Sequence, residues 1–292
     1  MLLAMGVSIV TGSPSNAMPV FSQVSGAGGG VAATESTNLL AGIVSVLVLT
    51  PFFYAGFDTI PQQAEEAAEG LNWNKFGKII TLALLAAGGF YMVCIYSFGT
   101  ILPWDEFVSQ PVPALACLKN INMILYVAML VIATLGPMGP MNSFYGATSR
   151  IMLAMGRKGQ LPEQFAEVDE KSGAPKLACV VLAVITIVGP FLGKNMLIPL
   201  TNVSALAFIL SCTMVALACL KMRYTEPDLP RPYKVPGGKF GIFLAILAGA
   251  IIIGLLVLPF SPASLDMVEW SIVIGWLVVG FILMFVTKAR AK

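Results

Sequence analysis

The segment Thr50–Asp58 places a proline, a glycine and an acid within nine residues of an otherwise apolar stretch. Pro51 has no N–H to donate and its ring crowds the carbonyl of Leu47, so a helix is expected to loosen there. Gly56 follows, and Asp58 adds a carboxylate two residues later. In lipid, freed backbone groups are tolerated only where they are buried in protein or line a cavity. An acid at membrane depth is costly and usually functional. The segment therefore predicts a ligand-binding site at a broken membrane helix.

Simpler explanations of the same residues stay open. The four aromatic side chains at this break could pack against lipid or other helices, or could form a lid over a ligand; they are Phe52, Phe53, Tyr54 and Phe57. Asp58 could lie close enough to the membrane surface to be hydrated. The coincidence of an ionisable residue with a helix break favours the binding site.

A second interruption is expected at Gly136-Pro137-Met138-Gly139-Pro140, which precedes Asn142 and Ser143. Its two prolines each remove a backbone hydrogen bond from a helix. Glycine and proline are frequent in membrane helices, so a kinked structural helix and a functional break are equally compatible with this sequence.

The composition is that of a membrane protein. Of the 292 residues, 57% are hydrophobic and only 11% are charged, the mean hydropathy is +0.86 and the net charge is +2. Charged residues alone make up ~25% of soluble sequences. The absence of histidine excludes Ser-His catalysis and HExxH zinc sites. The five cysteines contain no CxxC pair, so they are expected to be small core residues.

Seven apolar segments have about the length that a transmembrane helix needs. They are Leu39–Ile60, Ile79–Leu102, Ile121–Tyr145, Leu177–Gly193, Met196–Leu220, Phe240–Phe260 and Met267–Thr287. With the C-terminus in the cytoplasm, only Lys119 and Lys194 of the 17 lysines and arginines lie outside. Cytoplasmic loops carry an excess of these residues, so the charges predict a multi-pass protein with a cytoplasmic C-terminus, in a membrane that stays unidentified.

The same alternation places the Gly/Ser-rich loop 11–38 outside. Met1–Val10 is apolar, but a ten-residue helix rises only ~15 Å, about half of the hydrocarbon core. We therefore expect residues 1–10 to be the residual end of a truncated span. Whether the truncation is biological stays open.

Three motifs resemble the amino acid–polyamine–organocation (APC) permeases. Phe53–Ile60 followed by Ala64-Glu65-Glu66 resembles the signature of their sixth helix. The stretch from Ser149 to Pro175 resembles the cytoplasmic motif after helix eight, although Gly156-Arg157-Lys158-Gly159 departs from the usual Ala-Arg-Asp-Gly type. Residues 227–236 resemble the loop after helix ten. The three motifs occur in the same order and at the same topological positions as in that family, and the resemblance covers nearly the whole chain.

The resemblance implies an all-α integral membrane protein with a five-plus-five inverted-repeat transporter fold. The seven full spans would be helices six to twelve: residues 39–220 the five-helix second repeat, 221–239 a cytoplasmic loop, and 240–292 two C-terminal transmembrane helices with a short cytoplasmic tail. The partner of this chain would be the missing N-terminal half of the transporter, which carries the glycine-rich break of helix one.

The resemblance also assigns roles to residues. Phe52, Phe53, Tyr54, Ala55 and Gly56 would form the ammonium-facing half of a substrate site, with the carbonyls of Phe53 and Ala55 as acceptors and Phe52 as the cover. Asp58 would be linked to a proton. Discontinuous helices offer such unpaired carbonyls to cations. Asn142 and Ser143 are the candidate contributors to an ion site; proton and sodium coupling both stay open, and no cofactor or metal is expected.

The expected function is secondary active transport of an amino acid or related amine, by exchange or by net uptake, with no activity from this fragment alone. A seven-span receptor is the alternative, since an outside N-terminus fits the charges equally well. An intramembrane enzyme is not expected, because Asp58 is the only acid expected near the membrane interior and an aspartyl dyad is therefore lacking. Nucleic-acid partners are not expected at so small a net charge.

Overall fold

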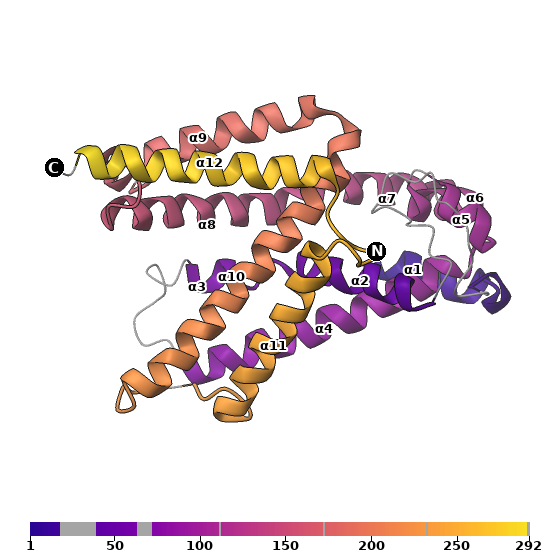
Figure 1. The fold of residues 1–292 in the computed structure, drawn as a ribbon. Helices are drawn as coiled ribbons and strands as arrows, with labels where there is room; N and C mark the ends of the chain where they lie inside the picture. The colour runs from indigo at the N-terminus through magenta and orange to yellow at the C-terminus, as the bar shows by residue number, and fades with distance from the viewer. Residues whose placement is uncertain (18–38, 63–71, 111, 172, 232, 291–292) are drawn as a thin grey trace. The chain divides into compact units, whose positions relative to one another are not determined.

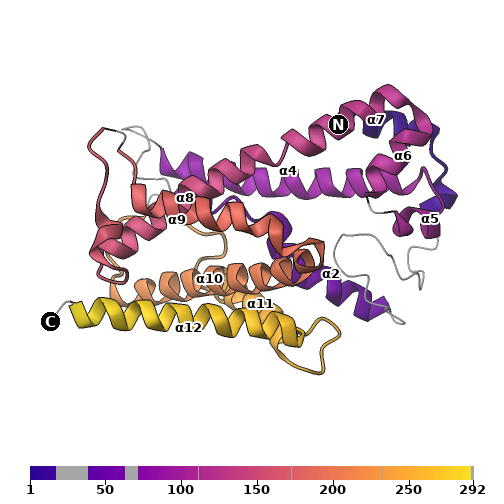
Figure 2. The same ribbon diagram turned by 90° about the horizontal axis from the view of Figure 1, so that it is seen from above.

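The computed structural model describes residues 1–17, 39–62, 72–110, 112–171, 173–231 and 233–290. All regular secondary structure in these ranges is helical (Figures 1 and 2). The chain forms two compact units. Unit 1 comprises Met1–Tyr54, Leu71–Gly136 and Ser204–Leu265, and unit 2 comprises Ala55–Gly70, Pro137–Val203 and Asp266–Lys292. The greater part of the predicted external loop, residues 18–38, and Ala64, Glu65 and Glu66 of the sixth-helix motif lie outside the described residues.

Five helices among the described residues are long and apolar enough to cross a membrane. They are Lys75–Gly99, Met123–Arg157, Leu197–Thr225, Gly238–Val257 and Met267–Thr287. Two further predicted spans correspond to shorter apolar helices, Leu40–Tyr54 and Lys176–Leu192. The described residues therefore confirm an all-helical structure with helices that could cross a membrane, while the count of seven full spans stays a prediction.

Unit 1 contains most of the long helices. Its elements are α1 (Leu2–Thr11), η1 (Pro14–Ala17), α2 (Leu39–Tyr54), α4 (Trp73–Gly99), α5 (Trp104–Ser109), α6 (Pro113–Ile121), α7 (Met123–Leu135), the greater part of α10 (Leu197–Thr225) and α11 (Gly238–Val257). Helix α4 begins at an N-cap, because the side chain of Asn72 accepts a hydrogen bond from the Lys75 N–H.

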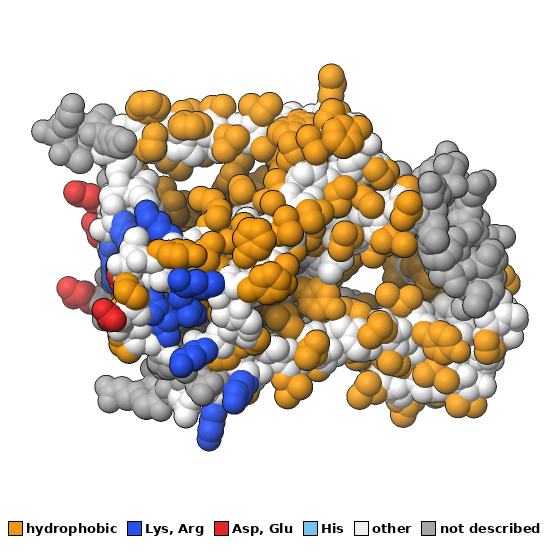
Figure 3. Space-filling model, turned by 60° about the horizontal axis from the view of Figure 1, so that its bottom comes forward, with side chains coloured by type: hydrophobic (Ala, Val, Ile, Leu, Met, Phe, Trp, Pro, Cys, Tyr) orange, Lys and Arg blue, Asp and Glu red, His pale blue; other side chains and the backbone are white. Residues whose placement is uncertain are grey.

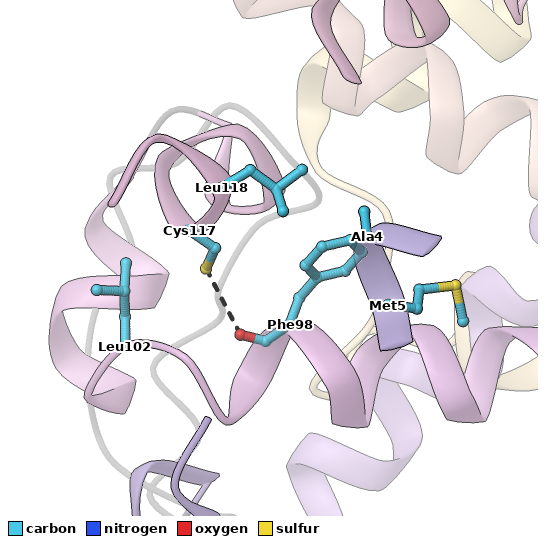
Figure 4. Close-up of a cluster of buried hydrophobic side chains, with 6 residues drawn as sticks. All are labelled: Ala4, Met5, Phe98, Leu102, Cys117 and Leu118. Carbon is cyan, nitrogen blue, oxygen red and sulfur yellow. Dashed lines mark hydrogen bonds between the residues drawn. The ribbon is translucent and has the colours of Figure 1, made fainter. Parts of the chain in front are cut away.

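A buried apolar cluster in unit 1 joins α1 to the end of α4 and to α6. Its members are Ala4, Met5, Phe98, Leu102, Cys117 and Leu118 (Figure 4). The Cys117 thiol donates to the Phe98 carbonyl at 3.5 Å. The chain after α1 is also held there, since the Ser13 N–H donates to the Thr100 carbonyl at 2.8 Å. The ends of α1 and α4 thus meet at one end of unit 1.

Helices α10 and α11 approach each other where Gly249 lies opposite Thr213. A Cβ atom at Gly249 would overlap the Thr213 hydroxyl, which donates to the Ile209 carbonyl at 2.7 Å. Small residues and locally bonded hydroxyls let membrane helices pack closely.

Unit 2 contains α3 (Thr59–Gln62), α8 (Met138–Arg157), η3 (Glu163–Ala166), α9 (Lys176–Val188), η4 (Gly189–Leu192), η5 (Lys194–Met196), the first residues of α10, and α12 (Met267–Arg290). Helix α8 packs against both α3 and α9, and the Tyr145 hydroxyl of α8 donates to the Cys179 carbonyl of α9. Next to α9, Lys176 forms a salt bridge with Asp169 at 2.6 Å.

The second predicted interruption is mild. Helix α7 ends at Leu135 and α8 begins at Met138, but the dihedral angles of Gly136 (φ −55°, ψ −46°) and Pro137 (φ −64°, ψ −18°) stay in the right-handed helical region. The backbone at these two residues therefore keeps helical dihedral angles, and a functional role for the interruption stays a prediction.

Candidate substrate site at the α2 break

The break predicted around Pro51 lies slightly later in the chain. Pro51 is inside α2, which continues to Tyr54, and residues 55–58 form a turn before α3 begins at Thr59. Gly56 in this turn has a φ of +127°. Chiral residues rarely adopt this conformation, which is open to glycine, so the glycine rather than the proline defines where the helix stops.

In unit 1, the end of α2 is held by a tyrosine of α4. The Tyr91 hydroxyl donates to the Phe53 carbonyl at 3.0 Å, and the rings of Tyr91 and Tyr54 meet edge to face with centroids 5.9 Å apart. The Tyr54 hydroxyl lies 2.5 Å from where a Cβ of Gly88 would be. The last carbonyls of a helix have no hydrogen-bond partner within the helix. The Tyr91 hydroxyl is the partner of one of these carbonyls, that of Phe53.

The carbonyls at the break differ in what they can still accept. That of Phe53 already receives the Tyr91 hydroxyl, but a carbonyl oxygen has a second lone pair. Within the described parts of the chain, no donor is bonded to the carbonyl oxygens of Tyr54 or Ala55. The Phe52 ring is 40% exposed and meets the Phe53 ring edge to face at 6.1 Å between centroids. The Ala55 carbonyl is therefore available to a ligand.

In unit 2, Asp58 closes the turn on itself. Its Oδ1 accepts the Gly56 N–H at 2.9 Å and its Oδ2 accepts the Gln62 side-chain amide at 3.1 Å. The Thr59 hydroxyl donates to the Gly56 carbonyl at 2.7 Å. Because Gly56 lies before α3, the Asp58 carboxylate braces the turn itself. Both oxygens of Asp58 thus stabilise the break.

The second group of predicted residues lies on α8. Asn142 and Ser143 are exposed, and the Ser143 hydroxyl donates to the Gly139 carbonyl at 3.3 Å. The Cζ atom of their neighbour Phe144 lies 4.0 Å from where a Cβ of Gly56 would be. In the described part of unit 2, α8 therefore meets the turn through Phe144, and an ion site at Asn142 and Ser143 stays a prediction.

Two polar contacts escaped the sequence analysis. Tyr91 could have been found from Gly88, because residues three apart share one helix face and a glycine in a membrane helix allows close approach. Glu269 lies in the last predicted span yet is only 4% exposed. Its Oε1 accepts the Asn202 side-chain amide at 2.5 Å and its Oε2 accepts the Asp266 N–H at 2.8 Å. Glu269 is therefore a second buried acid in a predicted span, and the sequence did not reveal it.

Comparison with known proteins identifies transporters as relatives. The chain is 25% identical over 252 residues to a branched-chain amino acid permease of Bacillus subtilis, a match that covers 85% of the chain and 51% of that relative. It is 25% identical over 185 residues to the human cystine/glutamate transporter (63% of the chain, 36% of the relative). It is 29% identical over 183 residues to the vacuolar cationic amino acid transporter 2 of Arabidopsis thaliana (61% and 27%).

The chain thus spans about half the length, or less, of these curated relatives. A family model described as amino acid permease matches residues 1–285, almost the whole sequence. The family is one of transporters rather than enzymes, and it gives the receptor alternative no support. The chain belongs to the amino acid permease family, within the APC superfamily.

Proposed function

We propose that the chain forms part of a secondary active transporter for amino acids or related amines, with the ammonium group received at the α2 break. The observation that carries this proposal is the turn at 55–58, where Gly56 at φ +127° stops the helix and the Ala55 carbonyl has no bonded donor among the described residues. An ammonium group carries three donors and no acceptor, so it matches a site made of carbonyl oxygens.

The relatives differ in the side chains that their names report, from branched-chain to cationic amino acids. All of these substrates share an amino group and a carboxylate. The proposed recognition at the break concerns only the amino group, so it leaves side-chain selectivity to other residues.

Asp58 is the proposed proton-linked group. Each of its carboxylate oxygens accepts one hydrogen bond in the turn. A proton on either oxygen would compete with the Gly56 N–H or with the Gln62 amide, because a protonated carboxyl gains a donor and loses acceptor capacity. Protonation would therefore loosen the turn, which links proton binding to the shape of the site. Sodium coupling through Asn142 and Ser143 is the other proposal.

The remaining part of the site would come from the portion of a permease that this chain does not match, and the 292 residues alone would not transport. The direct test is uptake of labelled leucine, lysine and aspartate into proteoliposomes. We expect no uptake with this chain alone, and uptake when it is fused behind the unmatched N-terminal portion of the Bacillus subtilis permease.

A binding measurement on the chain alone accompanies the uptake assay. Leucine, but not its α-hydroxy analogue without the amino group, should raise the unfolding temperature of the chain at millimolar concentration. Equal effects of the two compounds would contradict recognition of the ammonium group. Uptake by the unfused chain would contradict the proposal that the chain holds only half of the substrate site, and would support the proposal that it takes part in transport.

A further inference from the structure

A groove of about 550 Å³ lies in unit 1 between the start of α4 and the segment that joins α10 to α11. One wall is a single face of α4, since Lys78, Thr81, Leu82 and Leu85 follow the i, i+3, i+4, i+7 spacing of one helix stripe. The other wall is formed by Tyr233, Lys234 and Pro236.

The wall opposite α4 is fixed by two contacts. Tyr233 lies flat on α4 at Gly77, where a Cβ atom would come within 2.6 Å of its Cδ2 atom. Arg231 holds the segment before it, because its guanidinium donates to the carbonyls of Met222, Glu226, Pro227 and Leu229 at 2.6 to 3.0 Å. Several charge-assisted bonds to one guanidinium define a geometry well, so the groove is preformed.

The chemistry changes along the groove. Lys78 and Lys234 are both exposed, and neither forms an ion pair with an acid in the part of the chain that is described. Leu82 and Leu85, one and two turns further along α4, are 67% and 71% exposed. Figure 3 shows a cluster of Lys and Arg side chains that borders on apolar side chains. A groove lined by two lysines and, further along its α4 wall, by two leucines suits an anion with an apolar tail.

Lys78 is in the second turn of a helix that is long and apolar enough to cross a membrane. The lysines therefore lie at the level of the lipid head groups, on the side that the charge distribution predicts to be cytoplasmic. The cytoplasmic leaflet carries the anionic lipids, and basic pockets beside membrane helices bind their head groups. A soluble anion would satisfy the lysines and leave the two leucines uncovered.

We infer that this groove binds one anionic phospholipid, whose phosphate lies between Lys78 and Lys234 and whose acyl chain covers Leu82 and Leu85. The site is separate from the α2 break, and the inference does not depend on transport. Each lysine near a membrane surface contributes ~1 kcal/mol to the binding of an anionic lipid. Loss of both should therefore weaken binding roughly thirtyfold.

The test measures lipid binding to the purified 292-residue chain in detergent, by titration with dioleoyl phosphatidylglycerol or dioleoyl phosphatidylcholine and native mass spectrometry of the complexes. Wild-type chain should retain one phosphatidylglycerol and show no comparable preference for phosphatidylcholine. The double variant Lys78→Gln, Lys234→Gln should lose this preference. The control Lys158→Gln, Lys221→Gln removes the same charge at exposed lysines outside the groove and should keep it.

A second arm separates the lipid from its phosphate. Glycerol 3-phosphate at millimolar concentration should not displace the lipid, and Leu82→Asn should weaken lipid binding although the charge is unchanged. The inference is overturned if the groove variant and the control lose binding equally, if the groove variant keeps its preference, or if glycerol 3-phosphate competes fully. Exposed Lys→Gln changes leave packing intact, so each outcome reports on the groove.

Discussion

Asn202 donates its side-chain amide to Glu269 at 2.5 Å, which joins the second turn of α10 to the first turn of α12 in unit 2. Glu269 also caps α12 through the Asp266 N–H. With 4% of its surface exposed, the carboxylate depends on these two donors, because a buried charge without hydrogen bonds is strongly destabilising.

Replacement of Glu269 tests this pair. Glu269→Ala should lower the free energy of unfolding by about 1.5–3 kcal/mol, the typical worth of hydrogen bonds to a charged group. Asn202→Ala should cost as much or more, because it leaves the carboxylate buried with one donor. Thermal unfolding in detergent measures both. The exposed acid Glu163 serves as control, and an equal loss in Glu163→Ala would contradict the assigned role.

Gly56→Ala tests the break itself. At φ +127° an alanine is strained by about 1–3 kcal/mol, so both the stability and the leucine-dependent rise in unfolding temperature should fall. Gly89→Ala is the matched control, since α4 is regular there and a Cβ would meet no atom within 4 Å. It should be neutral or stabilising by up to about 1 kcal/mol. The reverse order of the two variants would refute the assignment of the break to Gly56.

Tyr91→Phe removes the hydroxyl that donates to the Phe53 carbonyl. We expect a loss of about 0.5–1.5 kcal/mol in unfolding free energy. We also expect a change in leucine affinity, because the freed Phe53 carbonyl can then accept a hydrogen bond from the amino group of the ligand. Tyr96→Phe, on the same helix and 51% exposed, should change neither quantity. Identical behaviour of the two variants would show that Tyr91 does not position the end of α2.

Gly249→Ala tests the close approach of α10 and α11. The new methyl group would overlap the Thr213 hydroxyl, and overpacking of this kind costs about 1–3 kcal/mol. Gly254→Ala in the same helix meets its nearest atom, Leu258 Cδ1, at an ordinary 3.7 Å and should be tolerated. The combination Gly249→Ala, Thr213→Ala should recover part of the loss, as residues in contact do not act additively.

Cys117 should show a shifted pH dependence of alkylation. Burial raises the pKa of its thiol to about 11; a hydrogen bond from the backbone of Cys117 itself lowers the pKa, and Glu106 adds to the rise. The thiolate is the reactive form, so N-ethylmaleimide should label Cys117 much more slowly at pH 9 than a cysteine placed at exposed Ser109. Each variant would keep a single cysteine.

The same shift has a consequence for stability. A thiol in the unfolded chain ionises near its ordinary pKa of 9.0, whereas in the folded protein the pKa of Cys117 is about 11. The contribution of Cys117 to folding is therefore complete below pH 9 and is lost as the pH rises from 9 to 11. A Cys117→Ala variant should lack this alkaline loss in thermal unfolding.

Much of the architecture could be predicted from apolar run length, and the reasons for the rest are local. Pro51 pointed to the right helix but not to the right residue, because a helix can continue for a turn beyond a proline and stop where glycine permits a positive φ. The sequence at Gly136 and Pro137 contained the same residue types, yet its backbone stays helical. Residue types alone therefore do not determine at which of two such sequences the helix stops; tertiary contacts contribute.

The site was predicted in its chain segment and incompletely in its contacts. The carbonyls of Phe53 and Ala55 could be proposed as hydrogen-bond acceptors from the motif alone. Tyr91, 38 residues away from Phe53, is brought to it only by the packing of α2 on α4. Glu269 was not predicted, because one acid in an apolar stretch hardly alters the mean hydropathy of that stretch. Its hydrogen bonds with Asn202 and the Asp266 N–H explain how it is buried.

The positive φ of Gly56 also has a genetic consequence. Every single-nucleotide change that alters a glycine codon introduces a chiral residue or a stop, and each L-residue meets the same steric barrier at this dihedral angle. No single-nucleotide substitution at this position is therefore expected to be neutral. Glycine could be replaced there during evolution only together with a change in the path of the backbone.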